Sequence, residues 1–213
     1  MMKTSDLSCC LFLTVTILTA ACDPGAPVDS KAVKEEIQSR KIRKVSASDI
    51  MTRALTTGEA IQAEVTRQHL AFLLAAEKGI DRCSLPSLPA VVAAQARGIE
   101  VSRISLNPRR RGRALDSVEV AVYEAFEYAA RRQLKIIPSL EELNETTLRY
   151  WAPIYMKAAC QRCHGKKGLQ IDAKTNKLLQ EQFPEDQSFD FEEGALMGLW
   201  RIKMPKKEII KNL

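Results

Sequence analysis

Apolar positions recur along the chain with two periods, one typical of helices and the other of strands. Within residues 47–78, a stripe with one member at every fourth position predicts a long helix with one face turned toward a core. The stripe consists of Ile61, Val65, His69 and Leu73. Alternation with a period of two predicts strands over residues 99–106, 148–156 and 196–204. Pro153 predicts that the second of these is an edge strand or an irregular one.

Capping and helix-ending residues mark further helices. Ser30 is a candidate cap for a charged helix that runs to about Lys44, and another helix is predicted over residues 88–97. Asp116, followed three positions later by Glu119, is a capping signal for one more helix. Several helices and a few widely separated strands, without a regular strand–helix alternation, predict an α+β fold with a small antiparallel sheet.

The N-terminal residues have the pattern of an export signal. A lone Lys3 precedes an apolar run over residues 9–21, which is shorter than the ~20 apolar residues of a spanning helix and ends in small residues. We therefore expect a signal peptide and an exported chain. Cys22 at the end of this run resembles the bacterial lipoprotein signal, and lipidation there would hold the chain at the periplasmic or cell-surface side of a bacterial membrane. The alternative is ordinary cleavage near Ala21.

Composition and charge narrow the classes of function. A hydrophobic content of 46% predicts a buried core. The formal charge of +6 is concentrated in Arg109–Arg113 and in the C-terminal lysines. For an exported chain we expect no nucleic-acid partner, so the basic run is interpreted as a solvated loop or as a docking surface for an acidic protein. Two histidines, His69 and His164, are too few for a multihaem cytochrome or a His-rich metal site.

The cysteines fall into groups by position. Two leave with the signal peptide, Cys22 is the predicted lipid site, and the motif Cys160-Gln161-Arg162-Cys163-His164 holds two more. Thiols at this spacing add to the two vinyl groups of one haem while the adjacent histidine reaches the iron. The motif therefore predicts a helical turn over residues 157–164 and one covalent haem c with His164 as an axial iron ligand. A structural zinc would need about four Cys or His ligands, and a thioredoxin-like dithiol would need a βαβ setting, which the pattern lacks.

Cys83 is the one cysteine that these groups leave unassigned. It is either a small buried hydrophobe or a thiolate ligand, and the sequence alone leaves both interpretations open. The candidates for the sixth position on iron are Cys83, His69, a methionine (Met156, Met197 or Met204) or no residue. A methionine would raise the reduction potential, an anionic thiolate would lower it, and an open position would admit small ligands.

The order of several segments is similar to that of a known family. The segments are Cys83, Arg103-Ile104-Ser105-Leu106, Pro108, Glu119, Tyr150-Trp151-Ala152-Pro153-Ile154, Cys160 to Gly165, Phe183-Pro184 and Gly194-Ala195. Together they resemble a bacterial family of c-type haem domains with a PAS-like fold, found as exported single proteins and as sensor modules. The resemblance covers roughly residues 47–206. It implies an antiparallel sheet flanked by helices, a long N-terminal helix, and a haem ligated by His164 on one side and Cys83 on the other.

The resemblance also suggests roles for residues around the haem. Arg103 and Ser105 are expected near a haem propionate, because an inward guanidinium favours a planar carboxylate. A structural ion pair with Glu119 is the alternative for Arg103. Trp151 is expected either to pack on the macrocycle or to be an ordinary core side chain. The family's usual Arg-Asn-Pro stretch is replaced here by Arg109–Arg111, which concerns the partner surface and leaves the ligand set intact.

These features predict three segments and a redox function. The segments are a signal peptide (1–21), a lipidated N-terminus with tether and charged helix (22–46) and a single c-type haem domain (47–213). The expected function is electron transfer or redox sensing with a separate redox partner protein. Sensing of CO or NO, with the signal passed to a separate partner, is one alternative, and a haem peroxidase, which would need an accessible sixth position, is another. Apart from the haem, the sequence has no catalytic constellation, so no enzyme activity is predicted.

Overall fold

The computed structural model divides into two units, Met1–Lys44 and Val45–Leu213. The residues that it describes are 29–39, 44–75, 85–110 and 112–211. In the first unit, helix α1 (Ser30–Ser39) has no buried residue. Its cap is Asp29 rather than the predicted Ser30, because the Asp29 carboxylate accepts hydrogen bonds from the first free backbone N–H groups of the helix.

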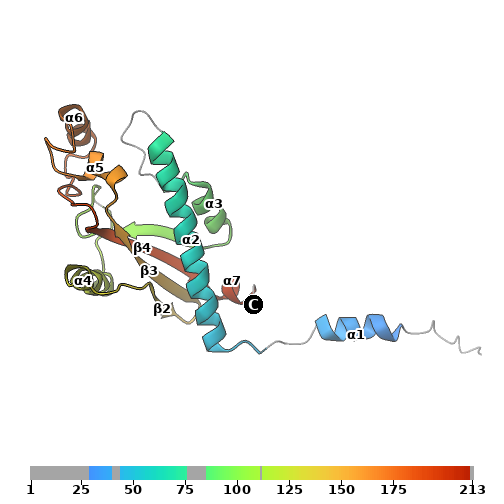
Figure 1. The fold of residues 1–213 in the computed structure, drawn as a ribbon. Helices are drawn as coiled ribbons and strands as arrows, with labels where there is room; N and C mark the ends of the chain where they lie inside the picture. The colour runs from blue at the N-terminus through green and yellow to red at the C-terminus, as the bar shows by residue number, and fades with distance from the viewer. Residues whose placement is uncertain (1–28, 40–43, 76–84, 111, 212–213) are drawn as a thin grey trace, which may run out of the picture. The chain divides into compact units, whose positions relative to one another are not determined.

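The second unit is built around a four-stranded antiparallel sheet (Figure 1). Its strands are β1 (Glu100–Ile104), β2 (Ser139–Asn144), β3 (Thr147–Tyr155) and β4 (Leu196–Pro205), in the spatial order β1-β4-β3-β2. All three pairings are antiparallel. Helices flank this sheet, which confirms the predicted α+β class and is consistent with a PAS-like fold.

One face of the sheet is covered by a long helix. Helix α2 (Ala47–Ala75) packs there with α3 (Pro89–Ala96) and α7 (Lys206–Ile210) over a large apolar cluster. The cluster includes Ala54, Val65, Leu148, Ile202 and Met204. At Gly58 a Cβ atom would lie 2.5 Å from the ring of Tyr150, so glycine is what allows α2 to approach β3 this closely. The predicted long helix is thus confirmed over its described residues.

The other face of the sheet is covered by helix α4 (Ser117–Arg131), around a cluster of aromatic and aliphatic side chains. The members are Ile104, Tyr123, Phe126, Trp151 and Leu199. The helix begins with the predicted capping box. The Asp116 carboxylate accepts the backbone N–H of Glu119 at 2.8 Å, and the Glu119 carboxylate accepts that of Asp116 at 3.1 Å.

The short pairing of β2 with β3 explains how a proline fits inside β3. Strand β2 pairs only with residues 147–151 of β3, so beyond Trp151 that side of β3 has no partner among the described strands. Pro153 lies in this outer part and is paired with Leu199 of β4 on the other side. Because proline donates no backbone hydrogen bond, the predicted edge character of this segment is confirmed. Strand β2 itself was not predicted.

Two short helices lie between β3 and β4. Helices α5 (Ala158–His164) and α6 (Ala173–Gln182) contact each other at one end of the sheet (Figure 1). Ile171, Leu179 and Phe183 form a small apolar cluster beneath α6. Among the described residues, no helix combines the length and the apolar character that a membrane span requires.

Candidate functional site

Helix α5 carries the Cys-x-x-Cys-His motif. It begins after Lys157, whose carbonyl accepts the backbone N–H of Cys160 at 2.8 Å, and it ends at His164. Cys160 and Cys163 are three positions apart, so their side chains share one face of the helix. Both are half-buried free thiols. The helical turn predicted over residues 157–164 is confirmed.

Gly165 lets the chain turn away directly after the histidine. A Cβ atom there would lie 2.6 Å from the backbone oxygen of Gln161 and 2.8 Å from the Cβ of Gln170. The N–H of Gly165 donates to that same Gln161 oxygen at 2.8 Å. Any side chain at this position would displace the backbone that ends α5, so the placement of His164 depends on this glycine.

A residue inside the motif attaches α5 to the long helix. The Arg162 guanidinium donates a hydrogen bond to the backbone oxygen of Leu73 at 2.9 Å. Leu73 belongs to the last turn of α2, where carbonyl groups lack intrahelical partners and favour a cation. The motif is therefore fixed against the C-terminal end of α2.

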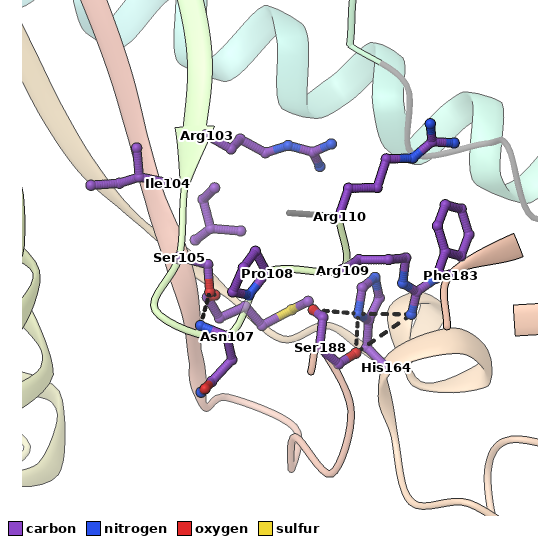
Figure 2. Close-up of a pocket in the computed structure, with 13 residues that line it drawn as sticks. Arg103, Ile104, Ser105, Asn107, Pro108, Arg109, Arg110, His164, Phe183 and Ser188 are labelled. Carbon is purple, nitrogen blue, oxygen red and sulfur yellow. Dashed lines mark hydrogen bonds between the residues drawn. The ribbon is translucent and has the colours of Figure 1, made fainter. Parts of the chain in front are cut away.

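His164 is held by a backbone carbonyl. Its Nδ1 atom lies 2.7 Å from the oxygen of Ser188 and 3.0 Å from the Ser188 hydroxyl (Figure 2). A carbonyl oxygen only accepts, so Nδ1 carries the proton and donates it, which leaves the Nε2 lone pair for another partner. Burial, followed by the nearby charge of Arg109, lowers the pKa of His164 to about 4. The imidazole is therefore neutral near pH 7, as a metal ligand requires.

Arg109 lies against the same histidine. Its Nη2 atom donates to the backbone oxygen of Cys163 and lies 3.4 Å from that of Ser188 and 3.3 Å from Nδ1 of His164. Its Nε atom lies 3.1 Å from Asp186 Oδ2, so the two side chains form an ion pair, although the Nε–H group makes no hydrogen bond. The interpretation of the basic run as a solvated loop or docking surface is therefore wrong for Arg109, because this side chain is only 12% exposed and is held by partners within the fold.

Two adjoining cavities border α5. The larger has a volume of about 580 Å³ and lies between the loop after β1 and α5 (Figure 2). The smaller has a volume of about 290 Å³ and lies between α2 and α5. Arg103, Ile154, His164 and Met197 line both. Cys160 and Cys163 line the smaller one, so both thiols and the imidazole border that cavity. The volumes of the two cavities are close to those of small-molecule and cofactor sites.

The chain is similar to a known protein family and to a solved structure. The family model described as Tll0287-like matches residues 31–205. The chain belongs to the Tll0287-like family. A solved structure, that of the cyanobacterial heme-protein Tll0287, is similar with a TM-score of 0.51 at 18% sequence identity, over 71% of this chain and 94% of that one. At this identity the likeness shows the fold. No curated protein matches.

Two residues predicted from the family resemblance line the cavities of this Tll0287-like chain. Arg103 borders both cavities, and its guanidinium carbon lies 6.0 Å from the centre of the Trp200 ring. Ser105 borders the larger cavity, but its hydroxyl donates to the backbone oxygen of Met197 at 2.8 Å. The structure thus brings both residues to the site, and of the two Arg103 is the one that carries a charge.

Trp151 is placed away from the cavities. It is 1% exposed, packs in the cluster under α4, and donates from Nε1 to Glu141 Oε1 at 2.8 Å. Its neighbours in β3, Tyr150 and Ala152, face α2 instead, because side chains alternate along a strand. Of the two roles predicted for Trp151, the structure therefore supports that of an ordinary core side chain. The tryptophan that lines the smaller cavity is Trp200.

The predicted candidates for a sixth iron ligand differ in whether they line a cavity. His69 lines the smaller cavity and Met197 lines both. Met156 and Met204 are 2% and 0% exposed and line neither. Cys83, like Cys22, lies outside the described residues. Within those described, no three Cys, His, Asp or Glu side chains gather as a metal site, so the zinc alternative gains no support.

Proposed function

We propose that this chain binds one haem covalently through Cys160 and Cys163, with His164 as an axial iron ligand. The observation that carries the proposal is the placement of both thiols and the imidazole of one seven-residue helix on a common cavity. The hydrogen bond from Nδ1 to Ser188 fits this role, because it directs the Nε2 lone pair toward another partner. The similar fold of a heme-protein adds support.

The cavity walls fit the rest of the group. Leu70, Leu73 and Trp200 supply an apolar lining for the macrocycle on the α2 side. Arg103, at the junction of the two cavities, is suited to a carboxylate and is our proposed propionate contact. Ser105 has its hydroxyl engaged with the main chain, so we assign it to the support of the wall rather than to direct binding.

Cys83 is our proposed sixth ligand. Its support is the family resemblance. His69 and Met197 are the alternatives that border the cavity. A thiolate stabilises ferric iron, so the expected reduction potential is low.

We further propose that the chain serves in electron transfer or redox sensing with a separate partner protein. The bound iron would supply one-electron chemistry, and the protein would supply the ligands, the apolar walls and the nearby charges. Export through residues 1–21 and lipidation at Cys22 would place the chain on the periplasmic or cell-surface side of a membrane. The cysteine-based attachment of haem suits that compartment.

The first test is haem attachment to the full chain. The pyridine haemochrome spectrum and the mass of the purified protein should show one haem that resists acidified acetone. A variant with Cys160→Ser and Cys163→Ser should lose it, while the matched control Cys83→Ser should keep it. Wild-type protein that loses its haem to acidified acetone, or carries none, would overturn the proposal.

The second test concerns the sixth ligand and the function. A ferric thiolate-to-iron band should disappear in Cys83→Ala and persist in His69→Gln and Met197→Leu. Reversible reduction without binding of added CO or NO favours electron transfer, whereas rapid binding of either gas would favour the gas-sensing alternative. Loss of the native ferric spectrum in His69→Gln, but not in Cys83→Ala, would refute the assignment of Cys83.

A further inference from the structure

We propose that Arg109 and Asp186 are paired positioning residues that hold His164 in place and set how readily the bound iron accepts an electron. This inference rests on the proposed function. It concerns residues that the motif does not include and that the sequence analysis did not assign to the site.

Arg109 joins the two backbone groups that control the histidine. One is the carbonyl of Cys163, immediately before His164, to which Nη2 donates. The other is the carbonyl of Ser188, which accepts Nδ1–H and lies 3.4 Å from the same Nη2. The guanidinium thus ties the end of α5 to the segment that orients the imidazole ring (Figure 2).

Asp186 completes the arrangement from the segment that follows α6. Its Oδ1 atom accepts the backbone N–H of Ser188 at 2.8 Å, and its Oδ2 atom lies 3.1 Å from Nε of Arg109. The carboxylate therefore fixes the turn that presents the Ser188 carbonyl and balances the guanidinium charge. His164, Arg109 and Asp186 come from three separate segments, and each contacts Ser188.

The pair is placed where its charges act on the ligand. The side chains of Arg109 and Asp186 are 12% and 10% exposed, so water and salt screen them far less than surface charges. A cation beside the axial imidazole favours reduced iron, and an anion favours oxidised iron. In the intact pair these effects oppose each other. Loss of the Arg109 charge and loss of the Asp186 charge should therefore shift the reduction equilibrium in opposite directions.

The experiment is a spectroelectrochemical titration of the full haem-loaded chain and its variants. Arg109→Gln should favour the oxidised state and Asp186→Asn the reduced state, each by about tenfold in the equilibrium constant, which is about 59 mV for one electron. Arg109→Lys keeps the charge and should stay within about threefold of the wild type. Arg67→Gln and Glu64→Gln remove the partners of an exposed ion pair (67% and 42% exposed) and should leave the potential unchanged.

The signs of the shifts distinguish this role from a purely structural one. If the pair were purely structural, both variants would be less stable, and their reduction potentials would move in the same direction or not at all. Either behaviour of the potentials overturns the inference. If Arg109→Gln does not fold, the comparison of Asp186→Asn with Arg109→Lys still decides it. Wild-type protein without covalent haem overturns the proposed function, whereas unchanged potentials in haem-loaded variants overturn this inference alone.

Discussion

Glu119 lies at the centre of a buried ionic network, and its replacement by glutamine should destabilise the fold strongly. The carboxylate is 0% exposed and accepts hydrogen bonds from Arg113 at 2.6 and 2.7 Å and from Arg201. Arg149, itself 4% exposed, lies 4.0 Å away. Glu119→Gln would leave these guanidinium groups near a neutral amide, two of them with little access to water.

The size of the effect follows from the pKa of this carboxyl. Burial would raise the pKa of Glu119, but hydrogen bonds from Arg113, the backbone N–H of Asp116 and Arg201 outweigh burial and lower the pKa from 4.5 to about 2. A difference of this size corresponds to about 3 kcal/mol of preference for the charged form in the folded state. Removal of one partner from a buried ion pair typically costs about 3–5 kcal/mol, so we expect a loss of about 3 kcal/mol for Glu119→Gln.

Urea denaturation as a function of pH is the assay. Because the folded-state pKa of Glu119 is depressed, its contribution is complete above the unfolded value of 4.5 and is lost as the pH falls toward about 2. The difference between wild type and Glu119→Gln should therefore be full near pH 7 and shrink between about pH 5 and pH 2. The control Glu142→Gln removes an exposed partner of Lys206 and should cost less than about 1 kcal/mol. A loss in Glu119→Gln no larger than in this control, or a difference independent of pH, would refute the reasoning.

Three further predictions concern a close helix–strand contact, the lining of the cavity and a helix cap. Gly58→Ala should cost about 1–3 kcal/mol in urea denaturation, because its Cβ would lie 2.5 Å from an aromatic ring, whereas Gly112→Ala, with nothing within 4 Å of its Cβ, should change stability by less than about 0.5 kcal/mol. Trp200→Phe should change the Soret circular dichroism of the haem-loaded protein and Trp151→Phe should leave it unaltered, since only the former lines a cavity; equal changes would contradict that placement. Asp116→Ala should lower stability by about 1 kcal/mol through loss of the α4 cap, and a thermal midpoint equal to that of the wild type would argue against it.

Local patterns account for the elements that the sequence predicted well. The stripe from Ile61 to Leu73 predicted α2, and Asp116 with Glu119 predicted the start of α4, because periodicity and capping depend on residues within a few positions of each other. The motif Cys160–His164 was equally local, since all its chemical groups lie within one helix.

Other features depend on contacts between distant segments. Strand β2, with the sequence SLEELN, alternates poorly and is a strand because it pairs with the start of β3. The face of Trp151 follows from its register in the sheet, and its proximity in sequence to α5 is no guide. Arg109 belongs to the site through Asp186 and Ser188, 77 and 79 positions away, and its place in a run of arginines suggested exposure instead.

The two thiols and the imidazole occupy one helix of seven residues, while the cavity that they all line is walled by α2, β1, β3 and β4. The information for attachment is therefore contiguous in the gene, and the information for the surroundings is dispersed through it. Under the proposed function, substitutions in the dispersed walls can alter the properties of the bound group over generations without disturbing the short peptide to which the group is attached. A laboratory library aimed at new redox properties would accordingly vary the walls and keep α5 constant.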